Sequence, residues 1–200
     1  HNSILVTGGS ATAGRGLYIN SSTTGTYGFV NIFNNNVVNT GGGYAMEASA
    51  ATATLGYLSG MNYNNYYGTG ATLVRYGTTD YATLADYQLG VPAFDANSVS
   101  GDPLFSANDD LHANSAVVNN VGTTGLGIAF DFDGDVRCPG GGCPGASANP
   151  DMGADEFAPA PNNAYPIDLI TPTADCGNSS QDILVTVGNL GLNTITSIDM

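Results

Sequence analysis

The chain has 200 residues and a formal net charge of −14, and its 3 basic residues are all arginines. Nucleic-acid binding and docking on anionic lipid both require clustered cations, so this charge argues against both kinds of partner. No apolar run approaches the roughly 20 residues of a membrane span, so no membrane insertion is predicted. Because the chain begins at His1 rather than Met, we expect a segment of a longer protein.

Residues 1–90 contain short β-prone runs separated by turns rich in glycine and asparagine; the runs include Ser3–Val6, Gly16–Ile19 and Phe29–Phe33. A repeat crosses this region. Asn64-Asn65 follows Asn35-Asn36 by 29 residues, and the same offset aligns residues 44–46 with 73–75. A weaker copy aligns residues 16–19 with 43–46 at an offset of 27.

Such a repeat is typical of stacked coils, none of which can bury its apolar side alone. The predicted fold is therefore all-β, a right-handed parallel β-helix with its coils in residues 1–90. Asparagine suits left-handed bends between the strands, and asparagines at equivalent positions of successive coils are expected to form a hydrogen-bonded ladder. The alternative is that these residues mark ordinary turns of an antiparallel sandwich.

A short helix is predicted over residues 81–90. Tyr81 and Leu84 share one face, Asp80 stands at the expected N-cap, and Gly90 stands just beyond the expected end. We expect this helix to lie across the side of the stack.

Residues 91–157 hold most of the carboxylates. Asp131, Asp133 and Asp135 alternate around a glycine, a pattern that can supply the oxygen ligands of Ca²⁺. The competing interpretation has no metal. In that case Arg137 forms a structural ion pair with neighbouring carboxylates, those of Asp151 and Glu156 included.

Cys138 and Cys143 are predicted to form a disulfide around a short glycine-rich loop. A zinc site is the weaker alternative, because two thiolates need two further ligands and the chain has only 2 histidines, His1 and His112. Cys176 is then left over, and its partner is expected beyond the segment.

Residues 158–166 are predicted to be a proline-rich linker. Beyond it, the runs Ile167–Ile170 and Asp182–Val187 indicate strands of a β-sandwich that begins in residues 167–200.

Four stretches resemble the end of bacterial right-handed, pectate-lyase-like β-helix surface proteins: residues 95–105, 110–112, 131–137 and 150–157. The resemblance covers about residues 16–157 and implies that residues 91–157 are the C-terminal closure of the β-helix. Residues 167–200 are similar to the start of immunoglobulin-like modules that follow such β-helices. Many proteins of this kind are exported by type IX secretion.

The resemblance implies a non-catalytic stalk or adhesive segment of a large exported protein at the bacterial cell surface. Its partners would be a carbohydrate or other cell-surface ligand, the secretion machinery, or further copies of itself. No catalytic residue is predicted, and a lone histidine such as His112 is more often structural. Two alternatives stay open: a polysaccharide-degrading enzyme with its active site upstream, and a self-assembling extracellular filament subunit.

Overall fold

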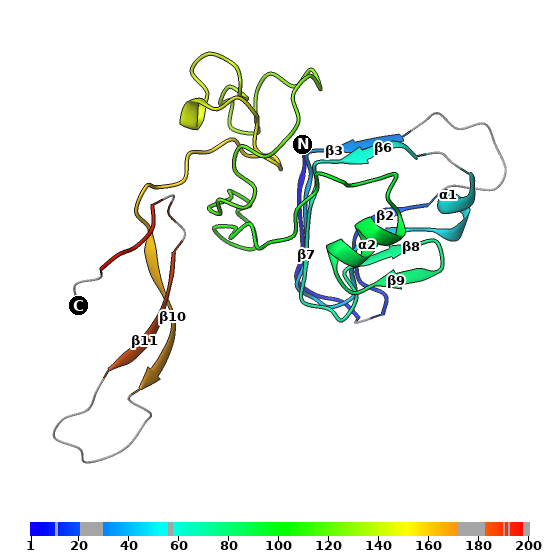
Figure 1. The fold of residues 1–200 in the computed structure, drawn as a ribbon, viewed down its shortest axis with the longest axis horizontal. Coiled ribbons are helices and arrows are strands. Elements are labelled where there is room, and N and C mark those ends of the chain that lie inside the picture. The colour runs from blue at the N-terminus through cyan, green and yellow to red at the C-terminus, as the bar shows by residue number, and fades with distance from the viewer. Residues whose placement is uncertain are drawn as a thin grey trace. The chain divides into compact units, whose positions relative to one another are not determined.

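The computed structural model describes residues 1–10, 12–20, 30–55, 58–171, 183–189, 191 and 193–197. They divide into two compact units, His1–Ala158 and Pro159–Met200 (Figure 1). None of the helices in the described ranges has both the length and the apolar character needed to cross a lipid bilayer.

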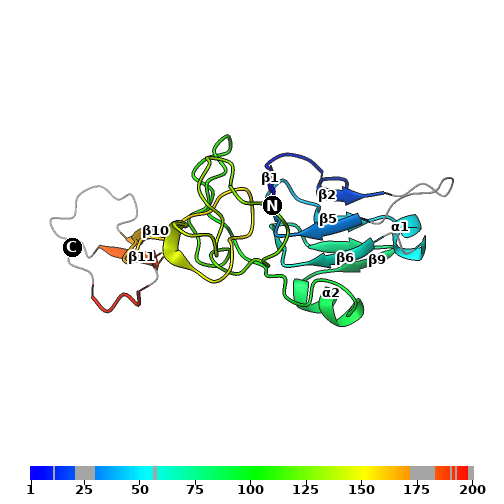
Figure 2. The same ribbon diagram turned by 90° about the horizontal axis from the view of Figure 1, so that it is seen from above.

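Parallel strands dominate the first unit, so the predicted all-β class is confirmed. The antiparallel-sandwich alternative is wrong for these strands, which stack in three sheets (Figures 1 and 2). The first sheet holds β1 (Ser3–Val6), β4 (Asn36–Asn39) and β7 (Asn65–Gly68), and the third holds β3 (Val30–Phe33) and β6 (Leu58–Asn62). The second holds β2 (Arg15–Ile19), β5 (Tyr44–Ala48) and β8 (Val74–Tyr76), with β9 (Thr79–Tyr81) added antiparallel at its edge.

The register confirms the repeat between β4 and β7, where Asn36 pairs with Asn65 at the predicted offset. The offset of 27 for the weaker copy is wrong, since Arg15 pairs with Tyr44, 29 residues on. Between β5 and β8, Met46 pairs with Val74 rather than with the predicted residue 75. The cause is the length of the turns, which differs from coil to coil, so each sheet sets its register separately.

The core of the first unit lies between these sheets. Large side chains that are almost fully buried there include Val37, Met46, Met61, Tyr66 and Val74. Short α1 (Ala50–Leu55) follows β5.

The second helix, α2 (Leu84–Gly90), begins later than predicted, with Thr83 as its N-cap. Asp80 lies instead in β9 (Thr79–Tyr81), where it pairs with Arg75 of β8, and this strand pairing excludes it from a helix cap. The helix packs Leu84 and Tyr87 onto the core between the sheets. It therefore covers the end of the stack, below β9 in Figure 2, and not the side as expected.

Asparagine side chains join successive levels of the parallel strands, which confirms the predicted ladder. The amide of Asn2 donates to Oδ1 of Asn35 (2.8 Å), and the amide of Asn35 donates to Oδ1 of Asn64 (2.9 Å). The amide of Asn64 in turn donates to the buried carboxylate of Asp95 (3.1 Å). Each rung thus satisfies polar atoms that would otherwise be unpaired in the interior.

The left-handed bends before these rungs follow the prediction only once. Asn34 adopts a φ of 55°, but the equivalent bend one coil later is made by Tyr63, also at 55°. The N–H of Tyr63 donates to Oδ1 of Asn62 (2.9 Å) and the N–H of the next residue, Asn64, donates to the hydroxyl of Ser98 (2.9 Å), so a residue that disfavours the conformation is held in it.

A glycine contact brings two turns together. A Cβ atom on Gly43 would overlap the carbonyl oxygen of Gly14 in the coil before it. Only glycine permits the turns to approach this closely.

Residues 91–157 have little regular structure. Their first part adjoins the last coil, where Val99 forms a parallel bridge with Asn65 of β7. Their later part contacts earlier coils: the Thr123 N–H donates to the side chain of Asn34 (2.8 Å), and the Ala154 N–H donates to the hydroxyl of Ser3 (3.0 Å). A second apolar cluster forms here, around Ala113, Val118 and Met152.

The second unit contains an antiparallel pair, β10 (Ala164–Thr171) and β11 (Leu184–Asn189). The predicted run Ile167–Ile170 lies within β10, and residues 184–187 of the second predicted run lie within β11, whereas Asp182 is outside the described residues. The predicted linker is too long, because Ala164–Pro166 already pair with β11. Cys176 lies outside the described residues.

Candidate functional site

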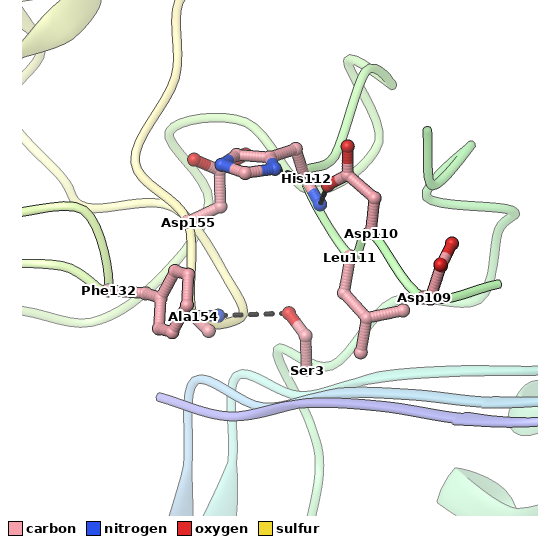
Figure 3. A pocket seen from close by; sticks show the side chains of 8 residues that line it. All are labelled: Ser3, Asp109, Asp110, Leu111, His112, Phe132, Ala154 and Asp155. Carbon is pink, nitrogen blue, oxygen red and sulfur yellow. Dashed lines mark hydrogen bonds and ion pairs between the residues drawn. The ribbon is translucent and has the colours of Figure 1, made fainter. Parts of the chain in front are cut away.

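A pocket of about 410 Å³ opens in the first unit (Figure 3). Ser3 of β1 forms one side of it, and irregular segments that are distant in sequence supply the remaining lining residues, Asp109, Asp110, Leu111, His112, Phe132, Ala154 and Asp155. Apolar and acidic side chains therefore share one cavity around a single imidazole ring.

His112 lies between two carboxylates. Oδ1 of Asp110 is in close contact with Nδ1 of the ring, and Oδ2 of Asp133 lies 2.6 Å from Nε2. These hydrogen bonds, the one to Asp110 first, raise the pKa of His112 to about 9. The ring is about half exposed, so it remains accessible from solvent.

Asp155 completes the group. Its Oδ2 accepts the backbone N–H of Ala113 (2.9 Å), which fixes the carboxylate. Figure 3 shows this side chain beside the ring of His112. Burial raises the pKa of this carboxyl group. One potential ligand atom from each of His112, Asp133 and Asp155 lies within 4.8 Å of the others. Within the described ranges, His112, Asp133 and Asp155 are the group of at least three potential ligand side chains that lie close enough together to hold one metal ion.

The three alternating aspartates predicted as Ca²⁺ ligands serve different purposes. Oδ1 of Asp131 accepts the N–H groups of Asp133 (2.9 Å) and Asp135 (2.8 Å), and its Oδ2 accepts the N–H of Glu156 (2.9 Å). Asp131 thus holds the turn, whereas Asp133 reaches toward His112. Asp135 is not a member of the His112 group.

Arg137 is almost completely buried, with a side chain only 3% exposed. Its Nη1 lies 3.2 Å from Oε2 of Glu156, and Nη2 donates to the carbonyl of Gly153 (2.8 Å). The predicted partner Asp151 contacts it through its backbone carbonyl instead (3.4 Å). The Asp151 carboxylate accepts N–H groups of the chain, one of them from Phe157 (2.8 Å).

Cys138 and Cys143 form a disulfide in the structure, and their Cα atoms are 5.3 Å apart. Both cysteines are buried. The N–H of Cys138 donates to Oε1 of Glu156 (3.1 Å), so the bridge adjoins the buried ion pair. Disulfide and ion pair together brace one loop region.

In the sequence His112 stands apart from other candidate ligands, because the residues that approach it come from loops without periodicity. A weak signal was nonetheless present, since Asp110-Leu111-His112 places a carboxylate two residues before the ring. Chemically, one imidazole nitrogen and adjacent carboxylate oxygens can hold a proton or a cation.

No protein-family model, no curated protein and no solved structure matches this chain.

Proposed function

We propose that this chain is a non-catalytic stalk or adhesive segment of a large exported bacterial cell-surface protein. In this proposal the three parallel sheets are the faces of a right-handed parallel β-helix, each of whose coils supplies strands to these faces, α2 and residues 91–157 close it, and an immunoglobulin-like module follows. A stack of coils joined by buried side-chain ladders resists bending and local opening, which suits an element that projects from a surface.

The observation that carries the proposal is the structural use of the charged groups. All three arginines are engaged with carboxylates: Arg15 with Glu47, Arg75 with Asp80, and Arg137 with Glu156. A lyase that removes a proton beside a uronate carboxylate needs a basic side chain that is available to the substrate.

The carboxylates support the same conclusion. A glycoside hydrolase requires two carboxyl groups at a set separation facing the substrate. Asp131, Asp151 and Glu156 each accept two or more backbone N–H groups instead. They are acceptors that shape loops, and this favours a structural part over a reaction centre.

The disulfide between Cys138 and Cys143 supports the proposed compartment. Disulfides persist in oxidising surroundings outside the cytosol. The absence of lysine and the charge of −14 suit an extracellular medium that contains salt and calcium.

The proposal is tested on cells that express the full-length protein. An antibody against this chain is expected to label intact cells as strongly as permeabilised ones. Labelling that requires permeabilisation would overturn the surface assignment. In parallel, the purified chain is incubated with uronate and neutral polysaccharides, and release of reducing ends or unsaturated products would favour the enzyme alternative.

A filament subunit is the second candidate, favoured by apolar side chains on the β10–β11 pair. Ile167 and Leu169 are both 57% exposed, and Leu184 is also exposed. Sedimentation velocity discriminates between the two: concentration-dependent growth beyond a dimer supports the filament, whereas a single monomeric species supports the stalk.

A further inference from the structure

We propose that His112, Asp133 and Asp155 bind a divalent first-row transition-metal ion such as Zn²⁺. This inference does not depend on the proposed function. It also differs from the Ca²⁺ site predicted at Asp131, Asp133 and Asp135, of which it retains only Asp133.

The first support is geometric. Zinc binds imidazole nitrogen and carboxylate oxygen at about 2.0–2.2 Å, which places neighbouring ligand atoms of a tetrahedral site about 3.4 Å apart. The three ligand atoms lie within 4.8 Å of one another, and Nε2 of His112 is 2.6 Å from Oδ2 of Asp133. Side-chain rotations that move these ligand atoms by about 1 Å convert the arrangement into a coordination shell. The exposure of His112 and Asp133 permits such rotations.

The second support is the orientation of the ring. Asp110 contacts Nδ1 of His112, and once the ring gives up its second proton a carboxylate at this nitrogen fixes the tautomer that presents the Nε2 lone pair. That lone pair then faces the carboxylate of Asp133. Two lone pairs in such proximity require a positive charge between them, supplied by a proton or by a metal ion. Asp110 is thus a positioning residue.

The third support is the surroundings of Asp155. Its Oδ2 accepts the Ala113 N–H, which leaves the other carboxylate oxygen for a ligand bond. The adjoining 410 Å³ pocket, with Leu111 and Phe132 in its wall, gives access for water or an exogenous donor at the fourth position. The site would join segments of the chain that have no regular secondary structure.

The ligand types select the metal. Ca²⁺ prefers six to eight oxygen ligands, whereas imidazole nitrogen suits zinc, cobalt and nickel. The charge of −14 raises the local concentration of any cation, but only the nitrogen ligand discriminates among them.

The test is calorimetric titration of the whole chain, freed of metal with chelator, with ZnCl₂. Co²⁺ absorption provides a spectroscopic readout of nitrogen and oxygen coordination. One Zn²⁺ per chain is expected, together with a rise in melting temperature. Ca²⁺ at millimolar concentration is expected to leave both the Zn²⁺ titration and the melting temperature unchanged.

The variants separate this site from other donors. His112→Gln and Asp133→Asn are each expected to weaken Zn²⁺ binding at least about 10-fold, and Asp110→Asn about 10-fold through loss of orientation. The matched controls His1→Gln, which removes the only other histidine, and Asp135→Asn are expected to retain full affinity. Near-UV circular dichroism without metal verifies that each variant is folded.

Three outcomes would overturn the proposal. One is the absence of Zn²⁺ binding at 10-fold molar excess, which would leave His112 as a protonated bridge between Asp110 and Asp133. Another is unchanged affinity in both His112→Gln and Asp133→Asn. The third is stabilisation by Ca²⁺ but not by Zn²⁺, which would assign the cation to oxygen ligands alone.

Discussion

The buried side chain of Asn35 donates to Oδ1 of Asn64 (2.9 Å), and the backbone N–H of Asn35 donates to the same oxygen (3.0 Å). Asn64 donates onward to Asp95 and to the carbonyl of Ile32 (3.0 Å). One side chain thus satisfies polar groups on both neighbouring levels of the stack.

Asn64→Ala is therefore expected to lower the free energy of unfolding by about 2–4 kcal/mol, because several buried donors and acceptors lose their partner. Urea unfolding measures the loss. The exposed Asn97 provides a matched control, and Asn97→Ala is expected to change stability by less than about 0.5 kcal/mol. Equal effects of the two substitutions would show that the ladder does not stabilise the stack.

Substitutions at two glycines distinguish the cost of backbone strain from the cost of close packing. Gly43 and Gly125 have similar positive φ angles, 85° and 81°, but of the two only Gly43 has a neighbour that an added Cβ atom would overlap. Gly125→Ala is expected to cost about 1–2 kcal/mol from backbone strain alone. Gly43→Ala is expected to cost about 1–3 kcal/mol more, because the turns must separate. Similar losses in urea unfolding would contradict the close approach of the turns.

Removal of Arg137 is expected to be severe. Arg137→Met leaves the carboxylate of Glu156 buried without its cation, and such changes typically cost about 3–5 kcal/mol. Arg75→Met removes an exposed ion pair with Asp80 and is expected to leave the urea midpoint close to that of the parent. If the two variants unfold at the same midpoint, the buried pair is not a determinant of stability.

The disulfide predicts a specific thiol count. Of the 3 cysteines, one per chain is expected to react with a thiol reagent under denaturing conditions without reductant, and all three after reduction. Cys138→Ser combined with Cys143→Ser is expected to lower the unfolding free energy by about 2 kcal/mol, as for a short closed loop. Three reactive thiols in the unreduced protein would contradict the bridge and weaken the case for export.

The pH dependence of stability is expected to reflect Asp151. Burial raises the pKa of this carboxyl group to about 7, above the value of about 3.9 in an unfolded chain. The folded state therefore binds more protons than the unfolded state between these values. Its stabilising contribution is complete below about pH 4 and is lost as the pH rises through 7.

Asp151→Asn removes this titration. Its unfolding free energy is expected to fall less between pH 4.5 and 8 than that of the parent, even though the asparagine makes the protein less stable overall. Asp95, whose pKa burial also raises, is present in both proteins and cancels in the comparison. Parallel pH profiles would assign the dependence to other groups.

The stacking of strands could be predicted where residue types repeat. Asn35-Asn36 and Asn64-Asn65 identified the register of β4 and β7 and the ladder between them, because a buried amide needs a partner at a fixed spacing. The Cys138–Cys143 pairing is similarly a local property of a short loop.

The rest depends on contacts that leave no periodic trace. The predicted offset of 27 between residues 16–19 and 43–46 was wrong, because the turns differ in length while the strands still pair. The helix start was wrong because Asp80 joins a strand with Arg75. The grouping of His112 with Asp133 and Asp155 depends on irregular loops, whose paths are set by many weak backbone contacts rather than by a sequence pattern.

The common register of β4 and β7 bears on how such a chain changes length. Because each residue of β4 lies over its counterpart 29 positions later, duplicating that unit inserts another layer without turning any apolar side chain outward. A gain or loss of a single residue within a strand would invert its two faces. In-frame duplication can therefore extend the reach of the molecule by about 4.8 Å for each added layer, leaving both ends as they were.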